Sequence, residues 1–380
     1  MILDKKDTEY ASNYFIDYYN PIQNIEDYQR MVKLSRMEAF STPLLGMGGI
    51  EDDLYDVYDI HPKDMEFEII DCAKDAYYNT QHCNDLLEIT TSAPVEAGAP
   101  VRMLRWILKE KTTNKVVGFI RVCSPFLNCK PRHDWLGTTP KDDQALNRFN
   151  QHVAMGSIII PVQPFGFNYI GGKLLALLCI CHETREAFNQ KYGADLALFE
   201  TTSLYGSSKQ SSQYDGMKPF LRYKGLTESN FIPLLHDEKF RKFEKWFIDR
   251  NDGNPLVTTM TSRKMRAQNT MLTIVRKSLK EHNPEKLVEF EAVMNRLKDI
   301  TEQKRYYIST LGYSNSREVV LGQETELKKN EQNWHKFEWE FMLDWWKKKA
   351  GNRFENLRKE GRLRTELEVW NRDMDIQIIR

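Results

Sequence analysis

The chain has 380 residues, of which 41% are hydrophobic and 28% charged, and its formal net charge is zero. This length and composition predict a buried core and about two domains, which excludes bulk disorder. The charged N-terminus and the absence of a long apolar run predict neither a signal peptide nor a membrane partner, so we expect a cytoplasmic protein. Six cysteines without a CxxC pair or metal-ligand spacing predict reduced thiols and no metal site.

Charge is unevenly distributed along the chain. Residues 1–235 hold 24 Lys plus Arg against 30 Asp plus Glu, whereas residues 236–380 hold 30 against 24. The basic half attracts phosphate, although a solvated helical surface has the same composition. We expect an N-terminal extension over 1–63, an α/β domain over 64–235 and a basic, mainly helical region over 236–380.

The hydrophobic patterns predict the elements in chain order. For the α/β domain these are a helix over 64–87, strands over 102–109 and 115–123, a strand over 157–162, a glycine turn over 163–173, a helix over 174–191, a strand over 197–201, a short helix over 216–224 and a short strand over 231–235. For the last region they are helices over 239–249, 264–280, 284–304 and 331–349, with a strand over 304–312.

Three features of these elements bear on a site. A short polar turn joins the first two strands, so they form a hairpin. The third strand is almost wholly apolar, which places it in the centre of the sheet. Pro161 cannot donate a ladder hydrogen bond, so we expect strand pairing to break there.

The glycine turn Asn168-Tyr-Ile-Gly-Gly-Lys173 opens directly into an apolar helix. A helix N-terminus attracts anions, and glycine lets the backbone approach a pyrophosphate closely. The preceding strand, with Ile160 and Val162, has backbone groups that could pair with the amides of a pantetheine arm. The alternative is a tight turn that needs glycine only for packing.

The order helix, hairpin, interrupted strand, glycine turn, helix and strand resembles the GNAT N-acetyltransferase fold. That resemblance implies a mixed, mostly antiparallel sheet with flanking helices and a cofactor such as acetyl-CoA or another acyl thioester. The phosphate motif of the family is Arg/Gln-x-x-Gly-x-Gly/Ala, and this chain has Asn168 at its first position and Lys173 at its last. The residues that the resemblance assigns to the cofactor are Ile160, Val162, Asn168, Gly171, Gly172 and Lys173.

Several short segments resemble a narrower group, the DruA proteins of Druantia antiphage systems. These segments are Trp106–Arg121, Arg132–Gly137, Ile158–Pro161, Tyr205–Ser208 and Gly225–Thr227. The chain is also similar in shape to the Mom DNA-modification protein of bacteriophage Mu. Both resemblances imply a phage or antiphage protein in the cytoplasm of a bacterial host cell, with DNA as target and with partner proteins of the same system.

Four residues are candidates for proton transfer. His152 stands before the central strand, where an imidazole could act as a general base or be a satisfied structural side chain. Glu200 ends the fourth strand and could accept a proton or pair with an arginine. Tyr205 and Tyr214, in the following loop, are candidates for the acid that protonates a departing thiolate.

Cations and aromatic rings mark candidate nucleic-acid contacts. Arg132 could bind a phosphate and Trp135 offers a stacking face, although a surface Arg–Asp pair would look the same. Lys304 and Arg305 precede two tyrosines, as in proteins that bind single strands. The remaining basic candidates are Arg263, Lys264 and Arg266.

These patterns leave two main hypotheses, beside acylation of a protein or small amine. The first is a DNA-directed transferase with an acetyltransferase-like core, which performs base modification or acyl transfer. The second is a non-catalytic nucleic-acid-binding component of a phage or antiphage system, in which the cofactor site has decayed.

Overall fold

The structure is a computed structural model that describes residues 1–40, 49–94, 102–126, 128–203, 211–230, 234–258 and 263–370. The chain forms two compact units, and both are discontinuous in sequence. Met1–Lys33 and Glu228–Glu302 form one unit, called the helical unit here. Leu34–Thr227 and Gln303–Arg380 form the other, called the sheet unit. This division differs from the contiguous domains expected from the sequence.

Seven strands form one sheet in the order β1-β2-β3-β4-β5-β7-β6. The strands are β1 (Phe67–Asp71), β2 (Met103–Glu110), β3 (Lys115–Cys123), β4 (Val153–Pro161), β5 (Leu198–Ser203), β6 (Arg222–Asn230) and β7 (Thr301–Ser309). The β4–β5 pair is parallel, whereas the β1–β2, β2–β3, β3–β4 and β5–β7 pairs are antiparallel. The mixed, mostly antiparallel sheet, the hairpin and the central position of β4 are therefore confirmed.

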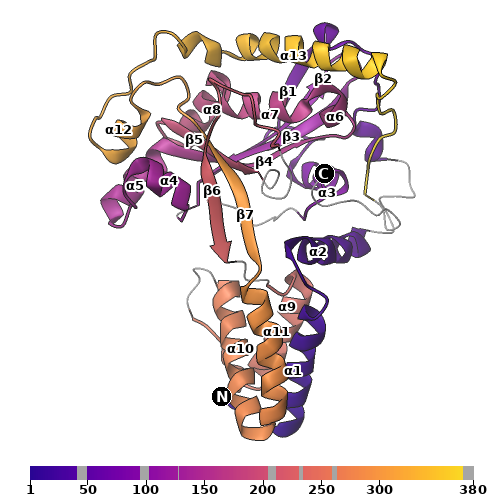
Figure 1. Cartoon of the computed structure of the whole chain (residues 1–380), viewed down its shortest axis with the longest axis vertical. Coiled ribbons are helices and arrows are strands. Elements are labelled where there is room, and N and C mark those ends of the chain that lie inside the picture. The colour runs from indigo at the N-terminus through magenta and orange to yellow at the C-terminus, as the bar shows by residue number, and fades with distance from the viewer. Residues whose placement is uncertain are drawn as a thin grey trace. The chain divides into compact units, whose positions relative to one another are not determined.

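The α-helices precede, connect and follow these strands (Figure 1). They are α1 (Lys5–Tyr19), α2 (Ile25–Phe40), α3 (Thr80–Thr90), α4 (Lys130–Leu136), α5 (Asp143–His152), α6 (Phe165–Tyr169), α7 (Gly171–Ile180), α8 (His182–Tyr192), α9 (Asp237–Asp249), α10 (Arg263–His282), α11 (Pro284–Lys298), α12 (Ser316–Leu321) and α13 (Trp339–Lys359). Short 3-10 turns occupy η1 (Glu51–Asp53), η2 (Pro62–Asp64) and η3 (Trp334–Phe337).

Helices cover both faces of the sheet. On β2, Leu104 and Trp106 point to one face and Ile107 to the other, because side chains alternate along a strand. The first face packs on α7, which is buried almost all round, and α13 lies over α7. The opposite face packs on α3 through residues such as Leu86. The glycine turn therefore begins a helix that belongs to the main core.

The helical unit has its own core, which brings together both ends of its sequence. Phe15 and Tyr19 of α1 pack with Phe243 of α9, Met271 of α10 and Phe290 of α11. Figure 1 shows these four helices lying side by side. The N-terminal segment is thus one wall of a bundle, and the other three walls come from the sequence between β6 and β7.

The expected helix over 64–87 is wrong. Residues 67–71 form β1, which pairs with β2, and the chain then turns before α3 begins at Thr80. The side chain of Asp75 holds this turn by accepting hydrogen bonds from the backbone N–H groups of Tyr77 (2.9 Å) and Tyr78 (2.7 Å). The apolar spacing thus resembled a helical face although a strand and a turn produce it.

The expected helix over 216–224 is also wrong. Residues 213–220 form turns, and β6 begins at Arg222. Gly216 has a φ of 76°, which is outside the right-handed helical region, and Pro219 cannot donate a helical hydrogen bond. The expected short strand over 231–235 lies partly outside the described residues.

The expected helix over 174–191 consists of two helices. α7 ends at Ile180 and α8 begins at His182, because Cys181 between them has an extended backbone. The expected strands over 197–201 and 304–312 correspond to β5 and β7. Among the described helices, none is both long and apolar enough to cross a bilayer.

Candidate functional site

The glycine corner, residues 163–173, lies between β4 and α7. Ile170 has a φ of 47° and turns the chain into α7. A Cβ on Gly171 would lie 2.6 Å from the ring of Phe165, and a Cβ on Gly172 would collide with the side-chain oxygen of Gln213. Both glycines are buried. The chain's own side chains therefore fill the space through which a pyrophosphate would approach the backbone.

Two polar side chains of the corner are held by other parts of the chain. Asn168 is fully buried, donates to the carbonyl of Arg364 (2.7 Å) and accepts from its N–H (3.1 Å). The Lys173 amine donates to the carbonyls of Gln213 (2.8 Å) and Asp215. Burial lowers the pKa of Lys173 to about 8. These contacts fit a closed corner better than a cradle for the phosphates of an acyl thioester.

The parallel ladder next to the corner is short. It ends at Gly156 and Thr201, where the Thr201 hydroxyl donates to the Gly156 carbonyl (2.9 Å). Residues 157–161 continue β4 but pair only with β3 in the part of the chain that the structure describes. Pairing with β5 thus ends earlier than Pro161. Ile160 lies on this segment, and the N–H of Val162 donates to the β3 residue Val117 (2.9 Å).

Glu200 belongs to a buried polar network. Arg132 of α4 donates to its carboxylate at 2.8 Å, and the Tyr306 hydroxyl of β7 donates to the other oxygen at 2.7 Å. Glu200 is 2% exposed and Arg132 is 0% exposed, with the guanidinium 4.4 Å from the Phe149 ring centre. Burial raises the pKa of Glu200, while Arg132 and Tyr306 act in the opposite direction.

This network decides between the alternatives for Glu200 and Arg132. Glu200 could accept a proton or pair with an arginine, and the pairing is confirmed, since both of its oxygens are engaged inside the fold. Arg132 was a candidate for binding a phosphate, with a surface Arg–Asp pair as the alternative, but it is buried in α4 and neutralises Glu200, because a buried carboxylate needs a partner. Trp135, on the same helix, is half-buried, and the Lys224 amine lies 5.5 Å from its ring centre.

The other proton-transfer candidates are scattered. His152 ends α5, and its Nδ1–H donates to the Asp195 carbonyl (2.6 Å), which suits the structural alternative. Tyr214 is 3% exposed and packs edge-on against Tyr307, and burial raises its pKa. Tyr205 lies outside the described residues. His152 and Glu200 occupy opposite ends of the short parallel ladder, and the structure does not join them in one site.

The segment that resembled a single-strand binder is part of the sheet. Tyr306 and Tyr307 are each 1% exposed, because β7 lies between β5 and β6. Lys304 is half-buried and bonds through its backbone to the neighbouring strand. Arg305 pairs with Asp215 at 3.3 Å. The two tyrosines that follow Arg305 therefore offer no exposed stacking face, whereas Arg305 itself lies 4.5 Å from the ring centre of the exposed Tyr223 on β6.

The basic candidates on α10 have different surroundings. Arg263 pairs with Glu244 of α9 at 2.7 Å, and the Lys264 amine lies 5.5 Å from the Phe240 ring centre. Arg266 is exposed. The positive excess of residues 236–380 does not belong to one unit, because the helical unit holds 18 Lys plus Arg and 18 Asp plus Glu. Any attraction for phosphate must therefore come from a local face.

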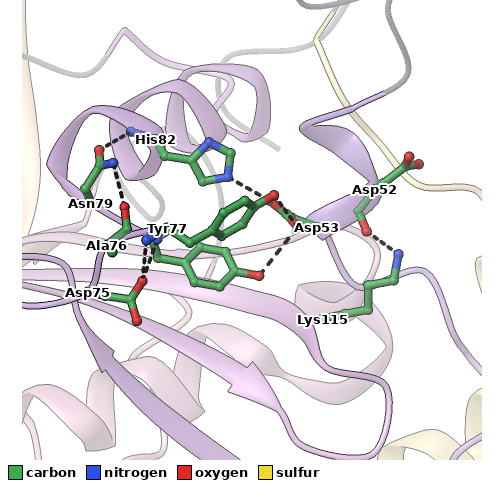
Figure 2. Close-up of polar contacts among 9 residues, drawn as sticks. Asp52, Asp53, Asp75, Ala76, Tyr77, Asn79, His82 and Lys115 are labelled. Carbon is green, nitrogen blue, oxygen red and sulfur yellow. Dashed lines mark hydrogen bonds and ion pairs between the residues drawn. The ribbon is translucent and has the colours of Figure 1, made fainter.

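Sequence reasoning missed a polar cluster between η1 and α3. Figure 2 shows His82 and Tyr77 pointing toward Asp53. The His82 Nε2–H donates to Asp53 at 2.7 Å, and the Tyr77 hydroxyl donates to the same carboxylate at 3.1 Å. These contacts tie the turn at Asp53 to the first turn of α3. The spacing of 29 residues between Asp53 and His82 left no local signal in the sequence.

The C-terminal segment was also missed. Residues 364–370 run along the glycine corner, where Glu368 forms a bridge with Gln163. Trp370 is 1% exposed and lies in the core beneath α3. A single tryptophan in a polar tail was the available signal, since large rings are rarely left in solvent.

These features define an α/β protein with a parallel β4–β5 pair, a closed glycine corner and a helical unit that combines the N-terminal segment with the segment between β6 and β7. The model of the family described as "Druantia protein DruA" matches residues 22–210, about half of the chain. The chain belongs to this DruA family. No curated protein and no solved structure matches the chain.

Proposed function

We propose that this chain is a non-catalytic, DNA-binding component of an antiphage defence system, built on an acetyltransferase-like sheet. Membership of the DruA family suggests the defence-system component. The DNA target and the loss of catalysis are the further steps that we argue from the contacts of the chain.

The sheet supports the acetyltransferase-like part of the proposal. Its strand order is β1-β2-β3-β4-β5-β7-β6, with one parallel pair at β4–β5 that separates beyond Gly156 and Thr201. A helix follows β4 directly after two glycines. This agrees with the resemblance to GNAT acetyltransferases and to the Mom protein that the sequence suggested.

The closed glycine corner is the observation that carries the non-catalytic part. Phe165 and Gln213 occupy the approach to Gly171 and Gly172, and Lys173 is bound to backbone carbonyls. An acyl thioester would have to displace these contacts before its phosphates reached the helix N-terminus. Retention of the sheet without this cradle fits a chain that keeps the shape of a transferase for another purpose.

DNA binding is supported by α10. From Arg263 to Lys280 this helix carries six Lys or Arg residues and no Asp or Glu. A helix with this composition attracts phosphate even in a unit with zero net charge, because the field near a surface depends on its nearest charges. The proposal therefore assigns DNA contact to the helical unit.

One observation favours the transferase as a second candidate. Within the described residues, 157–161 pair with β3 but not with β5. Their backbone N–H and C=O groups on the β5 side are therefore not used by this ladder. An extended arm of peptide-like amides, such as pantetheine, could add to β4 there. This candidate requires Gln213 and Phe165 to move when the cofactor binds.

Thermal-shift measurements on the full chain separate the two candidates. The binder should melt at a higher temperature with duplex DNA and show no shift with acetyl-CoA at millimolar concentration, since a ligand stabilises only the protein that binds it. A clear shift with acetyl-CoA, together with a new nucleoside adduct in DNA from cells that express the protein, would establish the transferase instead. No shift with any DNA would reject the binder.

A further inference from the structure

The exposed face of α10 has an unusual composition for a helix on a bundle. Its buried face packs into the core of the helical unit through Ala267, Met271, Ile274, Val275 and Leu279. The opposite face presents Arg266, Asn269, Thr273 and Lys277, all exposed. These positions follow the spacing i, i+3, i+7 and i+11, so they form one stripe along the helix. We call this set the α10 stripe.

Four of the six cations on α10 fall into two groups. Arg263 pairs with Glu244 at 2.7 Å, and Arg276 pairs with Glu291 at 2.7 Å, so these two arginines join α10 to α9 and α11. Arg266 makes no ion pair within the described ranges. The same is true of Lys277 on the stripe. The stripe therefore keeps its positive charge, while the flanking arginines are neutralised by neighbours.

We propose that the α10 stripe reads duplex DNA from the major groove. The inference rests on the proposed DNA binding and adds the groove, the element and the reading residues. Arginine recognises guanine and asparagine recognises adenine through paired hydrogen bonds, and an α-helix fits the width of the major groove. Arg266 and Asn269 are one turn apart on the same face, so one helix can present both to neighbouring bases.

The dimensions of the stripe agree with this function. Eleven residues of α-helix rise about 17 Å, which corresponds to about five base pairs. The Thr273 hydroxyl donates to the Asn269 carbonyl at 2.8 Å, so its oxygen still accepts hydrogen bonds from bases or water. The Asn269 side chain makes no hydrogen bond with other described residues, which leaves both amide groups for a base.

The composition of the stripe favours DNA over a protein partner. Protein interfaces gain most of their affinity from buried aromatic and aliphatic anchors. The stripe has none of these side chains and consists of two cations, an amide and a hydroxyl. No carboxylate occurs on α10 before Glu281, so the face has no group that repels a phosphate backbone.

Binding of the full chain to a fluorescent duplex of random sequence tests the assignment. The double variant R266A/K277A should bind about 10- to 100-fold more weakly at 100 mM salt, as an order of magnitude. Its log Kd should also depend less steeply on log salt, by about two phosphate contacts. The matched control R241A/K245A removes two exposed cations from α9 and should change Kd less than about twofold. Thermal melting checks that both variants fold.

Selection from a random duplex library tests the reading of bases. The natural chain should select a motif of about five base pairs, and N269A should lose preference at one of them while keeping its affinity for random duplex within about threefold. If R266A/K277A binds duplex DNA as tightly as the natural chain does, the α10 stripe is rejected while DNA binding by the protein stands. Equal or tighter binding to single-stranded DNA or to RNA would reject the major groove. Absence of any nucleic-acid binding would reject the proposed function as well.

Discussion

Arg132 and Glu200 place opposite charges inside the sheet unit, 68 residues apart in sequence. Removing one partner of such a pair leaves an uncompensated buried charge, which costs about 3–5 kcal/mol of folding free energy. We therefore expect R132M to lower the free energy of unfolding by about that amount in urea titrations. The double variant R132M/E200Q should recover at least about 1 kcal/mol relative to the sum of the single variants. Strictly additive losses would show that the two residues act independently.

The same pair predicts a pH dependence. Burial raises the pKa of Glu200, so the folded state holds this proton to higher pH than the unfolded state does. Stability from this carboxyl is thus greatest below the ordinary glutamate pKa and is lost as pH rises through the raised pKa. Without Arg132 the raised pKa should rise further. The loss in free energy of unfolding that R132M causes should therefore become smaller as pH falls toward the ordinary glutamate pKa, by at most about 1.4 kcal/mol per pH unit. Denaturation midpoints across pH would test this, and a loss independent of pH would contradict it.

Residue-level expectations were the least reliable part of the sequence analysis. The sequence shows that Arg132 and Glu200 carry charge, but a pair formed by α4 and β5 depends on how distant segments meet. A charged side chain that is buried pairs with another group of the chain, because an unpaired buried charge is costly, and it is then not free to bind a ligand. Lys173 follows the same rule at the glycine corner, where two carbonyls take its hydrogen bonds.

The glycine corner gives the prediction at the level of elements. G171A places a methyl group against the Phe165 ring at 2.6 Å and the Pro161 side chain at 3.0 Å, and neither group is flexible. We expect G171A to destabilise the chain by about 1–3 kcal/mol. G172A meets only the end of the Gln213 side chain, which can rotate away, so its cost should be smaller.

Thermal or urea unfolding of four variants tests this contrast. Adding Q213A should restore the stability lost in G172A, because the colliding side-chain oxygen is removed. It should not restore the stability lost in G171A. Equal losses in G171A and G172A, or rescue of both by Q213A, would mean that the corner is looser than the contacts indicate.

Elements with a strong local signal could be predicted from the sequence. The β2–β3 hairpin and β5 are short apolar or β-branched runs with clear ends, and they lie close to their expected ranges. β4 ends close to the expected position but begins at Val153, ahead of the expected 157. β1 was missed because Phe67–Asp71 is short and is followed by a turn that Asp75 caps, so the combined pattern resembled a helix. The number of helices after β4 was underestimated because one extended residue, Cys181, divides α7 from α8.

At the scale of the whole molecule, the N-terminal segment is structural. Phe15 and Tyr19 of α1 complete a core whose other members follow β6 in the sequence. Deleting residues 1–33 should therefore expose the apolar faces of α9, α10 and α11, which cannot fold as isolated helices. We expect loss of helical circular dichroism together with aggregation in size-exclusion chromatography. A truncated chain that stays monomeric and keeps the helical signal of the remaining bundle would contradict this.

The division into units could not be predicted from a linear reading. Composition changes at His236, and this suggested a boundary there, but the sheet takes β7 from beyond that point and the bundle takes α1 from the chain's beginning. Discontinuous units leave no composition signal at their true boundaries, because each boundary falls within an element: one in α2, one in β6 and one in β7.

β6 and β7 are neighbours in the sheet, and Thr227 and Lys304 bond across them at 3.1 Å. The chain therefore leaves the sheet at the end of β6 and rejoins it at the start of the neighbouring β7, and pairing of these two strands requires no particular segment between them. A lineage could exchange that segment, together with the N-terminal helix α1, for a different helical unit without rebuilding the seven-stranded sheet. Sequence variation among relatives should therefore be greatest in the helical unit and smallest in the sheet unit.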